Sequence, residues 1–185
     1  MRFKMQAFAT DGVVAGALLG QKVFAAMIAE TVPPSEPETM YIDFAGVDVA
    51  TVSFLRESVL AYRNHARSHW ANVYPVVTNL SAKVLEELEN YVIERGDALV
   101  ATTGTDVRVL GRLEEKQELT LKAVIKEGEV DAPTLAERYK KNGPASPTAW
   151  NNRLVALALK GLLIELSSGR SKRYRPVLER LRYGS

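Results

Sequence analysis

Residues 146–154 decide the expected fold of the second half of the chain, and they read Ser146-Pro147-Thr148-Ala149-Trp150-Asn151-Asn152-Arg153-Leu154. A serine before a proline is typical of a helix start, because serine is a favoured N-cap and proline suits the first helical position. Another helix is expected just before this one, with Asp131 as its N-cap. A strand follows Leu163, turns at residues 167–173 and returns at residues 174–176. The expected order is therefore helix, turn, helix, strand and hairpin.

This order of elements resembles a winged helix-turn-helix DNA-binding domain, an α+β fold that would span residues 114–185. The resemblance implies that the helix beginning at residue 146 lies in the major groove and reads base edges from its first turns. With Leu154 and Leu157 in the core, helical periodicity turns Thr148, Asn151 and Asn152 outward. Asparagine can form two hydrogen bonds with adenine, and threonine can contact a base edge or a thymine methyl group. The residues expected to contact DNA are Ser146, Thr148, Asn151, Asn152 and Arg153 of the helix, and Arg170, Lys172 and Arg173 of the hairpin.

Basic residues gather toward the C-terminus. Residues 1–113 carry 10 Lys and Arg against 13 Asp and Glu, whereas residues 114–185 carry 14 against 9. This asymmetry is typical of chains that contact nucleic acid. The basic hairpin is then expected to lie on the phosphate backbone of double-stranded DNA. The alternative is a solvated hairpin whose charges only maintain solubility.

The helix expected to read DNA also has an apolar side. Val155, Ala156 and Ala158 stand where many such helices carry arginine or lysine. This pattern predicts that the helix is buried on a second side, against the first domain or against a dimer mate. Trp150, one turn before Leu154, is expected in the core rather than as a platform for base stacking. Because such readers commonly pair on two half-sites, a homodimer is expected.

Strands and helices alternate in the first half of the chain, which predicts an α/β layer over residues 1–105 with right-handed crossovers. Strands are expected at residues 2–9, 40–44, 73–77 and 98–102, and helices at residues 14–30, 52–67 and 81–96. Residues 106–113 are expected to be a linker or the last strand. Gly16 and Gly20, one turn apart, are expected to allow a close backbone approach.

Two short motifs suggest a family for this layer. Asp43-Phe44-Ala45-Gly46-Val47 ends one expected strand, and Ser53-Phe54-Leu55 opens the next helix. Together they resemble a divergent STAS domain covering roughly residues 1–105. In anti-sigma-factor antagonists of that family, an Asp-Ser-Ser-Gly-like segment holds a phosphorylatable serine, which Ser53 matches in position. Thr51 and Phe54 depart from that segment, so Ser53 is interpreted either as an N-cap or as a phosphosite.

Several functional classes are not indicated by the sequence. Cysteine is absent, which excludes disulfides and thiolate catalysis. His65 and His69 share a helix face but lack a third ligand, so no metal site is expected, and no cofactor or enzymatic activity either. The apolar run at residues 12–20 is too short for a membrane span. A cytoplasmic protein without membrane contact is expected.

The sequence therefore predicts a DNA-binding transcriptional regulator. Its STAS-like domain would mediate dimerisation or sense a signal or protein partner. The alternative is a protein-interaction adaptor of a partner-switching type, in which the winged helix docks proteins, since this fold also serves that purpose.

Overall fold

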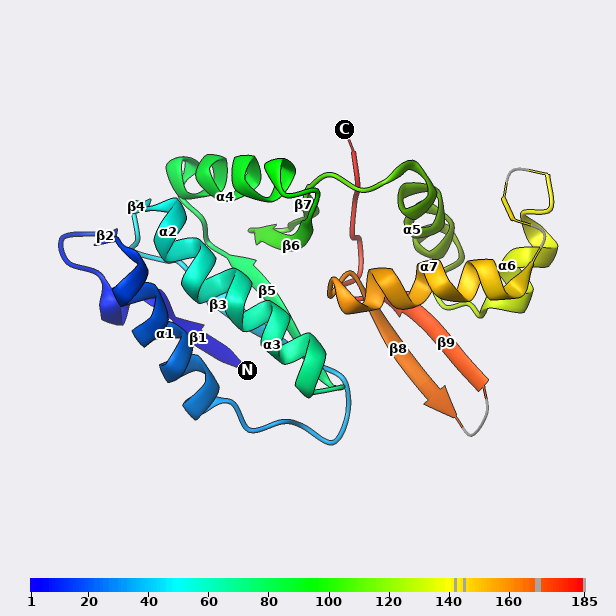
Figure 1. Ribbon diagram of the computed structural model, residues 1–185, viewed down its shortest axis with the longest axis horizontal. Coiled ribbons are helices and arrows are strands. Elements are labelled where there is room, and N and C mark those ends of the chain that lie inside the picture. Colours follow the sequence, from blue (N-terminus) through cyan, green and yellow to red (C-terminus); the bar gives the residue numbers. More distant parts are fainter. Residues whose placement is uncertain (142, 145, 169–170, 185) are drawn as a thin grey trace.

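The structure is a computed structural model that describes residues 1–141, 143–144, 146–168 and 171–184. Its centre is a five-stranded sheet with the order β1-β3-β5-β6-β7 (Figure 1). The strands are β1 (Arg2–Lys4), β3 (Glu38–Asp43), β5 (Val73–Thr78), β6 (Ala98–Thr103) and β7 (Asp106–Gly111). Neighbouring strands are parallel from β1 to β6, and β7 is antiparallel to β6. The expected mixed α/β fold is confirmed in this coarse form.

The helices of the first half pack against one face of this sheet. They are α1 (Ala17–Glu30), α2 (Val52–Leu55), α3 (Ala61–His69) and α4 (Ala82–Glu94). A π turn, Arg56–Leu60, joins α2 to α3 without a break in the helix. The short strands β2 (Val13–Val14) and β4 (Val49–Ala50) form a separate parallel pair. The strand expected at residues 2–9 is shorter than predicted, because Met5–Phe8 form a 3₁₀ turn.

Alternation along the strands divides the interior into two cores. On β5, Val73 and Val77 face the core that holds α1, α3 and α4, whereas Tyr74 and Val76 face a second core. That second core also contains Trp150 and the other buried side chains of the C-terminal half. A parallel strand buried on both faces is expected to be largely apolar, and all six residues of β5 are buried, with Thr78 at its end as the polar exception. The C-terminal half therefore packs on the face of the sheet that the first four helices leave open.

In the described part of the C-terminal half, three helices precede a hairpin (Figure 1). Its elements are α5 (Glu115–Glu127), α6 (Ala132–Arg138), α7 (Pro147–Leu159), β8 (Leu163–Ser168) and β9 (Ser171–Pro176). β8 and β9 pair antiparallel. Between α5 and α6, Val130 pairs with Tyr174 through two backbone hydrogen bonds of 2.8 and 2.9 Å. The hairpin thus gains a third, one-residue strand, so α6 is held close to the base of β9.

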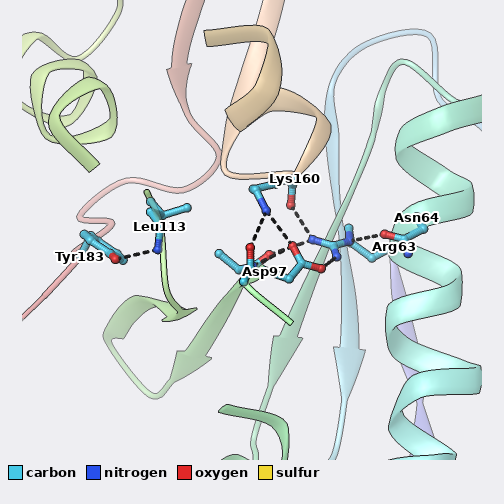
Figure 2. Close-up of polar contacts among 8 residues, drawn as sticks. Arg63, Asn64, Asp97, Leu113, Lys160 and Tyr183 are labelled. Carbon is cyan, nitrogen blue, oxygen red and sulfur yellow. Dashed lines mark hydrogen bonds and ion pairs between the residues drawn. The ribbon is translucent and has the colours of Figure 1, made fainter. Parts of the chain in front are cut away.

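The chain then returns to the first sheet. Val109 of β7 donates a backbone hydrogen bond to the carbonyl oxygen of Arg182 (3.0 Å), and Arg182 donates one to Val107 (2.9 Å). The hydroxyl of Tyr183 accepts a hydrogen bond from the backbone N–H of Leu113 at 2.9 Å (Figure 2). These bonds cover part of the free edge of β7. Since residues 106–111 form a strand of the main sheet, only the last part of the segment expected at 106–113 is a connection.

A polar cluster joins the two halves. Arg63 of α3 pairs with Asp97, and its Nη1 donates to the carbonyl oxygens of Ala98 (2.8 Å) and Lys160 (3.2 Å), as Figure 2 shows. Lys160, just after α7, donates through Nζ to Asp97 Oδ1 at 3.0 Å. Arg67 adds a bond from Nε to the carbonyl oxygen of Ala158 at 3.1 Å. The C-terminal end of α7 is therefore anchored to α3 and to the start of β6.

Some expected caps are confirmed and others are wrong. Ser81 accepts a hydrogen bond from Val84 N–H (3.2 Å), and Asp131 accepts one from Thr134 N–H (2.8 Å), as an N-cap does. Ser146 stands at the N-cap of α7, but its side chain makes no capping hydrogen bond. At the start of α2 the cap is Thr51, not Ser53.

The two glycines of α1 have different roles. An added Cβ at Gly20 would lie 2.8 Å from the carbonyl oxygen of Phe54, so the expected close approach is confirmed there. Gly16 has nothing within 4 Å of such a Cβ, but its φ of 87° is one that residues with a Cβ rarely adopt. Gly16 is thus required by the turn into α1, and Gly20 by the packing of that helix.

Within the described ranges, no helix combines the length and the apolar character needed to cross a membrane.

Candidate nucleic-acid interface

The helix α7 is fixed by one deeply buried side. Trp150, Leu154 and Leu157 are completely buried. The indole Nε1 of Trp150 donates to the carbonyl oxygen of Pro144 at 2.9 Å, and this bond ties the preceding turn to the helix. Trp150 is therefore a core residue, as predicted. The opposite side of the first turns exposes Thr148 and Asn152.

Three of the predicted DNA-contacting residues surround one hollow. Thr148, Asn151 and Lys172 line a depression of about 370 Å³ between α7, α6 and the hairpin. The complete lining is Asp131, Ala132, Pro133, Pro147, Thr148, Asn151, Ser171 and Lys172. The helix contributes polar groups to one wall of this hollow, and the hairpin contributes a cation to the other. We call this depression the distal hollow.

The remaining predicted residues are distributed differently. Ser146 is exposed at the start of α7, and Asn152 is exposed one turn later. Arg153 lies on another side of the helix, with its guanidinium 5.7 Å from the centroid of the Trp150 ring, and lines a separate hollow beside α5. Arg170 lies outside the described residues. The structure thus brings Thr148, Asn151 and Lys172 together and separates Arg153 from them.

The cations of the hairpin have acidic partners that the sequence reasoning missed. Lys172 Nζ lies 2.7 Å from Glu165 Oε1, and Arg173 Nε lies 3.1 Å from Glu129 Oε1. The hydroxyl of Tyr174 also donates to Glu165, at 3.1 Å. Burial alone raises the pKa of Glu165, but Lys172 and Tyr174 outweigh it, so this pKa lies below its ordinary value. The pair of Glu165 with Lys172 could be predicted from their positions on adjacent strands of the hairpin. The pair of Glu129 with Arg173 could not, because it depends on the one-residue strand at Val130.

Asp131 also lines the distal hollow and places a negative charge there. Hydrogen bonds from Thr134, first of all, and the charge of Arg173 hold the pKa of Asp131 below its ordinary value. The carboxylate is therefore ionised at neutral pH and is committed to capping α6. Lys140 and Lys141 are exposed in the turn between α6 and α7 and do not line this hollow.

The C-terminal half of α7 faces the first half of the chain. Val155, Ala158 and Leu159 line a second hollow of about 460 Å³. Its complete lining is Ser35, Pro37, Arg67, Ala71, Asn72, Tyr74, Val155, Ala158, Leu159, Glu165, Leu166 and Ser167. We call it the junction hollow, because it lies between the two halves. The prediction that α7 is buried on a second side by the first domain is supported, since Ala158 is buried and bonded to Arg67.

The other candidate residues are not assembled into sites. Ser53 is the second residue of α2, and its hydroxyl lies 3.2 Å from that of Thr51. Thr51 accepts hydrogen bonds from the backbone N–H of Phe54 (3.3 Å) and of Gly16 (3.0 Å), so it, and not Ser53, is the cap. His65 and His69 stack with ring centroids 4.2 Å apart. Among the described residues, no three histidine or acidic side chains are grouped to hold a metal ion.

Comparisons with known proteins identify no relative of this chain. No protein-family model, no curated protein and no solved structure matches this chain.

Proposed function

We propose that the chain binds double-stranded DNA as a transcriptional regulator, through a winged helix-turn-helix unit formed by α5–α7 and the hairpin β8–β9. The observation that carries this proposal is the distal hollow, where Thr148 and Asn151 of α7 face Lys172 of the hairpin. A helix that presents hydrogen-bonding side chains beside a basic hairpin can contact base edges and phosphates together. The third strand at Val130 supports the same unit, because it joins the hairpin to the connection between α5 and α6.

The ion pairs of the hairpin are too weak to prevent its cations from binding phosphate. The side chains of Lys172 and Arg173 remain about half exposed, at 51% and 53%. Exposed ion pairs contribute about 0–1 kcal/mol, so phosphate oxygens can replace Glu165 and Glu129 at little cost. In free protein these carboxylates reduce the positive potential of the hairpin. They are therefore expected to weaken nonspecific binding to DNA.

The proposed reading surface is confined to the first turns of α7. Thr148, Asn151 and Asn152 belong to it, whereas Val155 and Leu159 lie beside residues of the first half of the chain. In helix-turn-helix proteins the N-terminal residues of the recognition helix are those that contact base edges. The apolar second half of α7 is thus compatible with DNA binding.

The first half is proposed to be a STAS-like unit that mediates homodimerisation or senses a partner. Its sheet supports this proposal, because four parallel strands carry their helices on one face and the DNA-binding unit on the other. Changes in the first half could therefore reach α7 through direct packing. Light scattering of the full chain tests dimerisation, and a monomer at high concentration would refute it.

The proposed DNA contacts are tested by the salt dependence of binding. We would titrate duplex DNA with wild-type protein and with a Lys172→Ala/Arg173→Ala variant at several salt concentrations. Each lost phosphate contact should lower the slope of log affinity against log salt by about 0.9. The matched control is Lys22→Ala/Lys83→Ala, which removes two exposed lysines from the first half. Equal slopes in the two variants would refute a role for the hairpin, and no binding at low salt would favour protein docking instead.

A further inference from the structure

The junction hollow has the position and size of a small-molecule site. It measures about 460 Å³ and lies where α7 and β8 meet α3 and the loop before β3. Ligand sites commonly measure about 300–1,000 Å³ and often lie where two domains meet. Its apolar lining comes from both halves of the chain and includes Pro37, Val155 and Leu166. An apolar molecular body can therefore be held between the two halves.

One cation lies in the wall of this hollow. Arg67 donates from Nη1 to the carbonyl oxygens of Val73 (2.8 Å) and Ala71 (3.1 Å), and from Nε to that of Ala158 (3.1 Å). Its guanidinium carbon lies 3.9 Å from the centroid of the Tyr74 ring. The side chain stays partly exposed, with its guanidinium in the wall of the hollow. Its position is fixed by backbone carbonyl oxygens of two segments, residues 71–73 and the end of α7.

The charge of Arg67 has no direct acidic partner among the described residues. The ion pairs there involve Arg63, Lys160 and Lys172, and none includes Arg67. Burial lowers the pKa of Arg67 below its ordinary value, and Tyr74 and, to a smaller extent, the charge of Glu165 offset only part of this effect. A charge that is partly removed from water is stabilised by an opposite charge nearby. An anion in the hollow would supply the missing partner.

The nearby charges decide which anions fit. Glu165 lines the same hollow, but Lys172 lies 2.7 Å from its Oε1 and the hydroxyl of Tyr174 donates to its Oε2. With Arg67, Lys172 and Glu165 the local charge is thus +1. A single negative charge is matched, whereas a doubly charged phosphate is not. The apolar lining favours a carbon body beside that charge.

We propose that the junction hollow binds a small monocarboxylate with an aromatic or branched apolar body, its carboxylate facing Arg67. The ligand would touch Val155 and Leu159, which continue the helical stripe of Thr148 and Asn151 toward the first half of the chain. It would therefore lie on the same side of α7 and the hairpin as the distal hollow. If α7 binds DNA as proposed above, ligand and DNA compete for this side, and each lowers the affinity of the other by the same factor.

Side-chain NMR of the full-length chain tests ligand binding without DNA. The probes are benzoate, phenylacetate, indole-3-acetate and 4-methylpentanoate, each compared with its primary amide. The signal followed is the Arg67 Nε–H resonance, identified by its loss in Arg67→Lys. We expect at least one carboxylate to shift this resonance saturably, with its amide binding about tenfold or more weakly, since the amide lacks the charge. No shift from any of the four carboxylates up to about 10 mM, or equal binding of the amides, would overturn the proposal.

A matched pair of variants locates the site. Leu159 is 55% exposed on the rim of the hollow, so Leu159→Glu should fold while placing a negative charge beside the ligand. We expect it to weaken carboxylate binding about tenfold. Leu18→Glu, at an exposed leucine of α1, should leave binding unchanged. Equal binding by both variants would refute the assignment to this hollow.

A duplex-DNA titration with and without the bound carboxylate then separates the two proposals. Weaker DNA binding with ligand supports both. A ligand-dependent shift of Arg67 in a chain that binds no DNA supports the ligand site and refutes the DNA-binding function.

Discussion

The guanidinium of Arg63 donates a hydrogen bond to the carbonyl oxygen of Lys160, a residue 97 positions later in the chain, at 3.2 Å. The same guanidinium pairs with Asp97, which Lys160 also contacts through Nζ at 3.0 Å. One arginine thus joins α3, the start of β6 and the end of α7. The orientation of the proposed DNA-reading helix therefore depends on a residue of the first half.

Replacing Arg63 should destabilise the whole chain. The side chain of Arg63 is only 3% exposed, and Arg63→Met leaves Asp97 with Lys160 as its single charged partner. Breaking a buried ion pair costs about 3–5 kcal/mol, and we expect the lower end because Asp97 keeps Lys160. Urea denaturation measures the loss. Lys122→Met, which removes an exposed pair with Glu118, should cost less than about 0.5 kcal/mol, and equal losses would contradict this account.

Stability should depend on the ionisation of Asp97. Burial alone raises the pKa of Asp97, but the charge of Arg63 and hydrogen bonds from Arg63, Ala98 and Lys160 outweigh it, so the pKa lies below its ordinary value. The resulting stabilisation is complete above about pH 4, near the pKa in the unfolded chain, and is lost as the pH falls through the folded pKa. Asp97→Asn should therefore be less stable than wild type at pH 7, with the difference shrinking below about pH 4. A difference that is constant with pH would be incompatible with this account.

Gly20→Ala should destabilise the protein, although alanine in a helix interior ordinarily stabilises it by about 0.5–1 kcal/mol. The added Cβ would lie 2.8 Å from the carbonyl oxygen of Phe54 and 2.8 Å from Glu57 Cβ. Separating α1 from α2 to relieve this contact should cost about 1–3 kcal/mol. Lys22→Ala, at an exposed position of the same helix, controls for helix propensity. A higher unfolding temperature for Gly20→Ala than for wild type would disprove the close approach.

Glu129→Gln should strengthen DNA binding. This change removes the carboxylate 3.1 Å from Arg173 and leaves that arginine available to phosphate. Because exposed pairs contribute at most about 1 kcal/mol, affinity at low salt should rise about two- to fivefold. Glu86→Gln removes the same charge from an exposed site on α4 and should have no effect. Fluorescence anisotropy measures both, and an identical gain in the two variants would indicate only the change in net charge.

Local patterns in the sequence predicted the elements better than the contacts between them. The apolar run of β5 and the caps at Ser81 and Asp131 depend on neighbours within a few residues, and the structure confirms them. The cap predicted at Ser53 is wrong, because the family motif indicates the position of a phosphorylatable serine and not the residue at which the helix begins. Two residues earlier, Thr51 has the extended backbone that a cap requires.

The contacts between distant segments could not be derived from the sequence. The pairing of Glu129 with Arg173 follows from the Val130–Tyr174 strand pairing, and the hollow beside Arg67 follows from how α7 packs on α3. Neither leaves a periodic or compositional signal. Basic residues could be counted in the sequence, but the carboxylates that neutralise them become visible only in the fold.

Sequence-specific DNA binding is tested most directly by a ratio of two affinities. One is for duplex DNA from the region upstream of the gene that encodes the chain, and the other is for a scrambled duplex. We would measure this ratio by anisotropy for wild type, Asn151→Ala and the control Asn90→Ala, which changes an exposed asparagine of α4. The account predicts preference for the upstream sequence in wild type and in the control, and a loss of about 1–3 kcal/mol of that preference in Asn151→Ala. Equal binding of both duplexes by wild type, or an unchanged preference in Asn151→Ala, would contradict the account.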